Sequence, residues 1–256
     1  MITRERPCLV DGRAEDCGRL PDGLYVWQNV RTEGVHGLNA GRHLELLNAA
    51  AREVLGFGVQ SDARGLESQI SKLLSDNGYP SDGSFSYVTL RQYLTGEFMI
   101  VANEILPYRT RKLRSVFPRA GIVDYDLPFS ERPSSLSEAA HDVARAALRR
   151  ENPDLKCVLR CNGAGEIVSA DGAPLFIIEK ECVIAPPREF GSVEFECVEM
   201  AAAKSGLQFA TEPLDRERIL AAEELFYADH RGVTSVLSCE GHLYIHLLTE
   251  RIGKQY

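Results

Sequence analysis

Residues 165–187, GEIVSADGAPLFIIEKECVIAPP, constrain the fold of this chain more than any other segment. An apolar run at residues 175–178 is followed by the charged residues 179–181 and by a return run that ends in two prolines. This pattern predicts a β-hairpin, preceded by a short strand and a glycine-bounded turn. A helical pattern then begins almost at once, at residue 193. The segment therefore predicts closely spaced strands followed by a helix.

The residues before this segment predict strands and helices in alternation. Residues 24–31 are rich in β-branched and aromatic side chains, which favours a strand. The Thr95-Gly96 pair separates two strand-like runs and so predicts a hairpin turn. Apolar spacing, caps and turn residues predict the other elements of this part: a strand-like piece at 8–13, a helix of about four turns after the cap residue Asn39, a helix at 61–76, and strands at 84–93 and 97–106.

A linker predicted at residues 126–135, DLPFSERPSS, divides the chain into domains at 1–125 and 136–256. Its two prolines and its serines prevent a helix from crossing it. Two α+β domains joined in this way normally hold a ligand in the cleft between them. The second domain is expected to contain these further elements: helices at 137–150, 193–205 and 215–222, and strands at 155–161, near 225, at 233–238 and at 243–248.

Composition excludes several classes of function. A chain of 256 residues with 44% hydrophobic content can build one large core or two modest ones. The net charge of −8 argues against a general nucleic-acid binder, because phosphate binding needs a positive field. No run reaches the roughly 18 apolar residues that span a membrane. The first residues also lack the apolar stretch of a signal peptide, so we expect a cytoplasmic protein with reduced cysteines.

Cysteines and histidines allow a metal site as the less favoured of two interpretations. Cys157 and Cys161 are four residues apart, as are His242 and His246, and Cys239 is near the second pair in sequence. In a strand such pairs share one face. Thiols and imidazoles buried in the core explain the same pattern and are the preferred interpretation, so we predict no metal.

A cluster of five positive charges interrupts an otherwise acidic chain at residues 107–119. It allows two interpretations, a solvated edge that charge protects from aggregation or an anion site at the mouth of a cleft. The solvated edge is preferred. The five residues are Arg109, Arg111, Lys112, Arg114 and Arg119.

The order of elements and several short motifs resemble the class IV family of pyridoxal phosphate (PLP) enzymes. This family includes branched-chain and D-amino-acid aminotransferases and aminodeoxychorismate lyase. Asp22-Gly23-Leu24-Tyr25 is similar to its Gly-Val-Phe-Glu strand, and Gly41-Arg42-His43-Leu44 to its His-x-x-Arg-Leu helix. Residues 224–236 are similar to its last strand pair. The resemblance covers about residues 6–245 and implies a two-domain, D-amino-acid aminotransferase-like fold and a homodimer.

The positions that the resemblance assigns to PLP carry other residues here. The lysine that forms a Schiff base with the cofactor would fall at residues 134–136, but there is no lysine between Lys112 and Lys156. The carboxylate that pairs with the pyridine nitrogen aligns with Ser169. The phosphate-binding arginine aligns with Leu46, although Arg42 is one turn earlier on the same helix face.

The helix start that binds the cofactor phosphate through backbone N–H groups aligns with residues 191–194. Gly191 and Ser192 suit an anion, whereas Glu194 repels one. Lys156 at the start of a strand and Lys180 in a hairpin turn would need an unfamiliar geometry to replace the missing lysine. The remaining polar groups available to a ligand in the cleft are Tyr25, Arg42, Ser169, Ser192, His230 and Arg231.

Three hypotheses stay open at this point. The first is a class IV aminotransferase-like protein in which unusual residues hold PLP, its activity in question because the usual contacts are absent. The second is a catalytically silent homologue that binds a small anionic metabolite or a partner protein in the cleft, since fold and function are separable. The third is a different small-molecule enzyme that uses the cleft without PLP.

Overall fold

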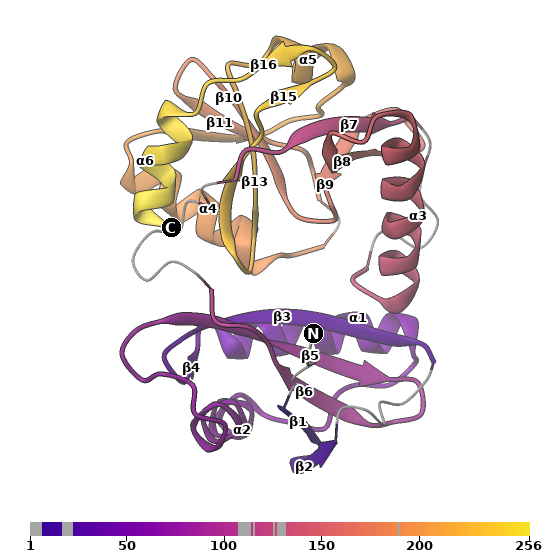
Figure 1. Cartoon of the computed structure of the whole chain (residues 1–256), viewed down its shortest axis with the longest axis vertical. Coiled ribbons are helices and arrows are strands. Elements are labelled where there is room, and N and C mark those ends of the chain that lie inside the picture. Colours follow the sequence, from indigo (N-terminus) through magenta and orange to yellow (C-terminus); the bar gives the residue numbers. More distant parts are fainter. Residues whose placement is uncertain are drawn as a thin grey trace. The chain divides into compact units, whose positions relative to one another are not determined.

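The computed structural model describes residues 7–16, 23–106, 114, 116–124, 126, 132–188 and 190–256. The chain forms two compact units, each with its own sheets and core (Figure 1). The first unit comprises Met1–Thr110 and Arg132–Ser135, and the second comprises Arg111–Glu131 and Leu136–Tyr256. Helices and strands occur in both units, which confirms the predicted α+β class.

The first unit is built on one antiparallel sheet with the strand order β2-β1-β6-β5-β3-β4. The predicted turn at Thr95-Gly96 is present between β5 and β6, and Gly96 adopts a φ of 109°, which suits glycine. The strands are β1 Pro7–Val10, β2 Arg13–Asp16, β3 Tyr25–Glu33, β4 His36–Gly37, β5 Phe85–Tyr93 and β6 Phe98–Ala102.

Two helices, α1 Ala40–Val54 and α2 Ala63–Asp76, pack their apolar stripes against this sheet. The Asp62 side chain caps α2 by accepting the backbone N–H of Gly65 at 2.7 Å. Asn39 stands at the expected start of α1, but it adopts a left-handed conformation and its side chain makes no capping hydrogen bond. The packing of the apolar stripe therefore fixes α1 more than its first residue does.

The second unit contains two sheets. The β10 sheet has the order β12-β11-β10-β13-β14, and the β8 sheet has the order β16-β15-β7-β8-β9. The strands of the β10 sheet are β10 Leu175–Glu179, β11 Cys182–Ala185, β12 Gln208–Thr211, β13 Glu224–Asp229 and β14 Gly232–Ser235. Those of the β8 sheet are β7 Arg119–Val123, β8 Leu155–Cys161, β9 Ile167–Ala170, β15 Ser238–Cys239 and β16 His242–Leu243.

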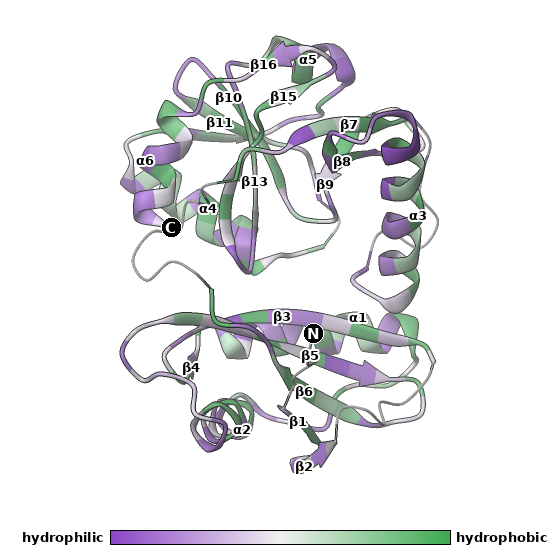
Figure 2. Ribbon diagram, in the orientation of Figure 1, coloured by the Kyte–Doolittle hydropathy of each residue, from purple (hydrophilic) through white to green (hydrophobic). Residues whose placement is uncertain are grey.

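The two sheets of the second unit enclose its main core. Side chains from both sheets and from α5 Arg216–Ala221 meet there. Helices α4 Val193–Lys204 and α6 Leu247–Gln255 cover the other face of the β10 sheet. Helix α3, Ser135–Glu151, covers the other face of the β8 sheet. Figure 2 shows α3 banded in hydrophilic and hydrophobic colours, as expected of a helix with one buried side.

The hairpin predicted from residues 175–187 is formed by β10 and β11. Glu179 pairs with Cys182, and the turn residues Lys180 and Glu181 have φ values of 48° and 63°. Two successive positive φ values are typical of the turns that match the twist of a hairpin. β10 also pairs with β13, so the hairpin lies in the middle of its sheet.

The strand predicted at residues 243–248 is wrong. β16 ends at Leu243, and α6 begins at Leu247. The buried carboxylate of Glu224 accepts the backbone N–H groups of Leu248 and Thr249, both at 2.8 Å. A carboxylate at these positions satisfies N–H groups that have no partner within the helix, so a residue distant in sequence starts the helix.

The strand predicted at residues 233–238 is divided between the two sheets. β14 ends at Ser235 in the β10 sheet, and β15 begins at Ser238 in the β8 sheet. The described residues also contain strands that the sequence did not predict, among them β7 and β12. β7 precedes the expected linker and pairs with β8 and β15 of the second unit. Residues 127–131 of that linker lie outside the described residues.

Candidate functional site

The lysines of the described residues are all exposed. Lys156 donates to the carbonyl of Pro153 at 3.3 Å, and Lys180 lies in the β10–β11 turn. Neither side chain is desolvated, as the amine of a Schiff-base lysine usually is. Lys112 lies outside the described residues. The exposed lysines are Lys72, Lys156, Lys180, Lys204 and Lys254.

Serines occupy the position to which the resemblance assigns the Schiff-base lysine. Ser134 is buried and forms an isolated β-bridge with Val26. The hydroxyl of Ser135 accepts the backbone N–H of Tyr25 at 3.4 Å. Both contacts lie within the first unit, so these serines have a structural role there.

Ser169 is buried on β9, directly opposite Arg160 of β8. The Nε of Arg160 donates to the hydroxyl of Ser169 at 3.3 Å, and the Arg160 side chain is only 12% exposed. A guanidinium nitrogen of Arg160 lies 3.7 Å from the half-exposed carboxylate of Asp126. The position assigned to a carboxylate by the resemblance therefore holds a hydroxyl that accepts from a cation.

His141 lies beside this pair, on the same face of the β8 sheet. Cys157 and Leu159 point into the core between the sheets, so Val158 and Arg160 point toward α3. His141 of α3 is 8% exposed, and its Nδ1 has no hydrogen-bond partner among the described residues. Burial lowers the pKa of His141 and the nearby Arg160 lowers it further, so the imidazole is neutral near pH 7.

The start of α4 is already satisfied by its own residues. The hydroxyl of Ser192 accepts the backbone N–H of Phe195 at 3.4 Å and donates to the Glu194 carboxylate at 2.8 Å. Burial raises the pKa of Glu194, while the hydrogen bond from Ser192 opposes this rise. A carboxylate in the first turn complements the helix dipole. The Glu194 carboxylate also occupies the position at which the helix dipole would stabilise an anionic ligand.

His230 and Arg231 form the turn between β13 and β14, next to the mostly buried carboxylate of Asp229. Asp229 accepts the backbone N–H of Arg231 at 2.8 Å and its Nε at 2.9 Å. Burial raises the pKa of Asp229, but His230, Arg231 and Arg114 outweigh burial, so its net shift is downward. Burial lowers the pKa of His230 to about 4. This turn therefore places a neutral His230 beside the paired carboxylate of Asp229.

Arg114 completes this cluster from the segment before β7. Its backbone N–H donates to the carbonyl of Val233 at 2.8 Å, and its side chain donates to the hydroxyl of Thr234 at 3.1 Å. The guanidinium also lies 4.0 Å from the Asp229 carboxylate. Arg119 of the same basic segment is exposed at the start of β7. Arg109, Arg111 and Lys112 lie outside the described residues.

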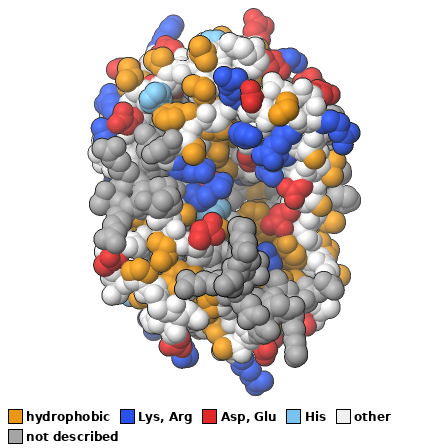
Figure 3. Space-filling model, viewed as in Figure 1, with side chains coloured by type: hydrophobic (Ala, Val, Ile, Leu, Met, Phe, Trp, Pro, Cys, Tyr) orange, Lys and Arg blue, Asp and Glu red, His pale blue; other side chains and the backbone are white. Residues whose placement is uncertain are grey.

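The structure brings three of the six predicted site residues into one neighbourhood of the second unit. Ser192 contacts Glu194, which is electrostatically coupled to His230, and His230 precedes Arg231 in the turn. Ser169 belongs instead with Arg160 on the α3 side of the β8 sheet. Figure 3 shows Lys and Arg side chains gathered over the part of the molecule that Figure 1 identifies as the second unit.

Tyr25 and Arg42 belong to the first unit. The Tyr25 ring lies 5.2 Å from the Tyr93 ring, and the Arg91 guanidinium lies 4.7 Å from the centre of the Tyr25 ring. Arg42 is exposed on α1 and forms an ion pair with Glu45 at 2.9 Å. In this arrangement Arg42 is a surface residue of the helix.

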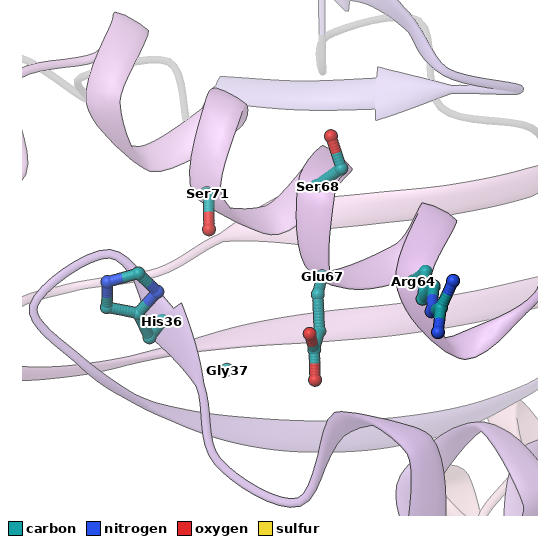
Figure 4. A pocket seen from close by; sticks show the side chains of 6 residues that line it. All are labelled: His36, Gly37, Arg64, Glu67, Ser68 and Ser71. Atoms are coloured by element: carbon teal, nitrogen blue, oxygen red, sulfur yellow. The ribbon is translucent and has the colours of Figure 1, made fainter.

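A polar depression of about 490 Å³ lies on the surface of the first unit, between β4 and α2 (Figure 4). Figure 4 shows the side chains of Arg64, Glu67, Ser68 and Ser71 projecting from α2, with His36 on β4. Most of these side chains are exposed, and none of the predicted site residues lines the depression. It has no buried polar group that would orient a ligand.

The described residues contain no cluster of three or more His, Cys, Asp or Glu side chains that could hold a metal. Cys157 and Cys239 are buried in the core between the sheets, where each lies opposite Ala120 of β7. His242 Nε2 lies 3.2 Å from the carbonyl of Ala222, and the His246 ring packs at 4.8 Å against the Phe117 ring. These thiols and imidazoles have structural surroundings.

Comparison with known proteins identifies the family. The model of the family "Amino-transferase class IV" matches residues 29–239. The chain belongs to this family. A comparison with curated proteins found no match.

Solved structures of class IV aminotransferases share the fold. A branched-chain aminotransferase from Thermoproteus uzoniensis with norvaline has a TM-score of 0.80 at 18% identity, over 97% of this chain and 92% of that chain. An aminotransferase from Brucella abortus bound to PLP has a TM-score of 0.81 at 14% identity, over 97% and 96%. A putative 4-amino-4-deoxychorismate lyase from Legionella pneumophila has 0.71 at 16%, over 89% and 88%. At these identities the likeness establishes the class IV fold alone.

Sequence comparison with the family pointed to Ser169, Ser192, Glu194, His230 and Arg231. It missed Arg160, which bonds to Ser169, and Asp229, which bonds to Arg231. It also missed His141, whose pKa Arg160 lowers. Arg160 carried a usable signal, because it is a charged residue within an apolar strand whose neighbours alternate between two faces. His141 carried none, since a single histidine on an amphipathic helix is common.

No helix in the described part of the chain has the length and apolar character needed to span a membrane.

Proposed function

We propose that this class IV protein does not use lysine-linked PLP and instead binds a small anionic metabolite in its second unit. The observation that carries the proposal is the hydrogen bond from Arg160 to the buried Ser169. The family resemblance assigns to position 169 a carboxylate that accepts a hydrogen bond from the protonated pyridine nitrogen of PLP. Arg160 and Ser169 offer hydrogen-bond donors and positive charge in its place, which suit the oxygens of an anion.

The residues aligned with the phosphate contacts support the same proposal. Glu194 at the start of α4 and Asp229 in the β13–β14 turn bring carboxylates to that region. Two carboxylates repel a phosphate group, and the hydroxyl of Ser192 is already bonded to Glu194. The described residues therefore do not fit PLP at its aldehyde, its pyridine nitrogen or its phosphate.

The alternative is a diverged class IV enzyme in which another lysine holds PLP. It is favoured by the family assignment and by the PLP bound to the Brucella abortus aminotransferase. Lys156 and Lys180 are exposed and Lys112 lies outside the described residues, so the modified lysine would have to be identified by mass spectrometry. The two proposals differ in whether a lysine becomes covalently modified.

The proposal is tested by measuring what the full chain binds. Native mass spectrometry of the protein as purified should reveal a small acidic molecule that dialysis removes. A thermal-shift series with monocarboxylates, dicarboxylates, inorganic phosphate and PLP should stabilise the protein with at least one anion. Stabilisation by PLP alone, with amino-donor-dependent turnover, would instead support the diverged enzyme.

We also propose that the protein is a cytoplasmic homodimer, as the family resemblance led us to expect. Light scattering at micromolar concentration measures the assembly directly. A mass of about twice the 28.4 kDa of one chain is expected. A monomer under these conditions would contradict the homodimer, without bearing on which ligand the chain binds.

A further inference from the structure

His141 occupies a defined place between α3 and the β8 sheet. Near the end of α3, the side chain of Arg149 donates to the carbonyl of Leu155, and Ala144, one to two turns earlier, packs with Val158. The helix therefore runs antiparallel to β8. One further turn back along α3 brings His141 to the level of Arg160, whose charge lowers the pKa of His141.

The two ring nitrogens of His141 have different surroundings. A Cβ added at Gly172, in the turn after β9, would lie 3.1 Å from the Nε2 of His141. This nitrogen is therefore packed closely against the turn. Nδ1 has no partner among the residues that the structure describes, although His141 is only 8% exposed. Buried polar atoms in proteins are nearly always hydrogen-bonded, so an unpartnered one calls for an occupant.

Arg160 and Arg145 carry the positive charges that act on His141. Arg145 is neutralised locally, because it bonds to the carboxylates of Asp142 at 2.8 Å and Asp171 at 3.3 Å. The ion pair of Arg160 with Asp126 is longer, at 3.7 Å, and Asp126 is half exposed. Arg188 adds a second positive charge near Arg160, and the Glu194 carboxylate acts on Arg188 as well. The cluster is thus suited to a negative group.

We propose that His141, Arg160 and Ser169 together form an oxyanion site, in which a carboxylate or phosphate oxygen accepts hydrogen bonds from His141 Nδ1, the Arg160 guanidinium and the Ser169 hydroxyl. This assignment rests on the proposed anion-binding function and names the residues that recognise the anionic group. A neutral imidazole carries one N–H proton, which Nδ1 can present to the anion. The guanidinium supplies the charge and a planar pair of donors.

Isothermal titration of the full chain with sodium acetate and with inorganic phosphate tests the assignment. The two probes distinguish a carboxylate from a phosphate, and at least one should bind to the wild type. Arg160→Gln and His141→Leu should each weaken binding of that probe by about tenfold or more, because a hydrogen bond to a charged group is lost. His141→Asn should restore most of the affinity, since its amide can donate from the position of Nδ1.

Arg149→Gln is the matched control, because Arg149 is an exposed arginine of α3 that bonds only to the carbonyl of Leu155 among the contacts described. It should bind the probe like the wild type. Circular dichroism of each variant shows whether it folds, and His141→Asn keeps the test decisive where His141→Leu does not fold. Binding that is equal in wild type, His141→Leu and Arg160→Gln would overturn this site but leave the anion-binding function standing. A wild type that binds neither probe, or that forms a lysine adduct with PLP, would overturn the proposed function itself.

Discussion

The carboxylate of Glu224 and the first turn of α6 form one structural unit, in which a Glu224 oxygen accepts both the hydroxyl of Thr249 at 2.7 Å and its backbone N–H at 2.8 Å. Glu224 is 1% exposed and Thr249 is fully buried. β13 and the last helix are thereby joined through a buried charge that the helix N-terminus solvates. This contact holds α6 on the outer face of the β10 sheet.

Glu224→Ala should lower the free energy of unfolding by about 3 kcal/mol, because it removes three hydrogen bonds to a charged group and leaves buried N–H groups without a partner. Urea denaturation followed by circular dichroism measures the change. Glu199→Gln, an exposed glutamate on α4, is the control and should stay within about 0.5 kcal/mol of wild type. Equal stability of the two variants would show that α6 does not depend on Glu224.

Gly172 and Gly165 provide a matched pair for the packing around His141. Both adopt a positive φ, 81° and 79°, but only Gly172 has a neighbour close to an added Cβ. Gly165→Ala should therefore cost about 1 to 2 kcal/mol from backbone strain alone. Gly172→Ala should cost more, because the methyl group also contacts His141 at 3.1 Å.

The double variant Gly172→Ala with His141→Ala separates these two effects in a double-mutant cycle. If the contact with His141 causes the extra loss, the double variant should be more stable than the sum of the two single changes predicts. Thermal or urea unfolding of the four proteins supplies the cycle. Simple additivity would place His141 away from the turn.

Protonation of His230 should reduce stability on mild acidification. Its pKa is about 4 in the folded chain and close to the ordinary value of 6.5 when unfolded. Between these values the unfolded chain binds a proton that the folded chain does not, so stability falls as the pH drops from about 6.5 to about 4, by up to about 3 kcal/mol. The lowered pKa of Asp229 acts in a lower window, below its ordinary value of 3.8.

His230→Gln should flatten the part of the stability profile between pH 6.5 and pH 4. His141, whose pKa is also lowered, retains a loss in the same direction and keeps the profile from becoming level. His36→Gln, at an exposed position on β4, is the control for the substitution itself. An unchanged slope in His230→Gln would show that this imidazole does not titrate as its burial requires.

Local signals made much of the fold predictable from the sequence. The β10–β11 hairpin has an apolar run, a short polar turn and a return run that all lie within the segment itself. The helix α2 has its own cap in Asp62 and its own stop in Gly78, whose φ is 72°. Such elements carry their boundaries with them, because the residues that end them are neighbours in sequence.

Elements that depend on distant residues were not predictable. β7 contains Gly121, which weakens the strand signal. In the structure a Cβ added at Gly121 would lie only 2.8 Å from a methyl carbon of Leu155. The pairing partners of β7 lie on β8 and β15, later in the chain. Likewise, α6 depends on Glu224, more than 20 residues earlier.

The candidate site was predictable only in part for a related reason. Alignment with the family drew attention to Ser169, but the meaning of that serine comes from Arg160 on the neighbouring strand and His141 on the covering helix. A β-strand register brings the first pair together, and the packing of α3 adds the third residue. Neither relationship is present in the local sequence.

The absorbance spectrum of the purified protein with and without added PLP, followed by borohydride reduction and intact mass measurement, tests the central claim most directly. We predict no protein-dependent absorbance band in the violet region and no stoichiometric adduct on a single lysine at equimolar PLP, because none of the described lysines is desolvated. A band together with an adduct on a single lysine would contradict the claim and identify the residue that binds the cofactor.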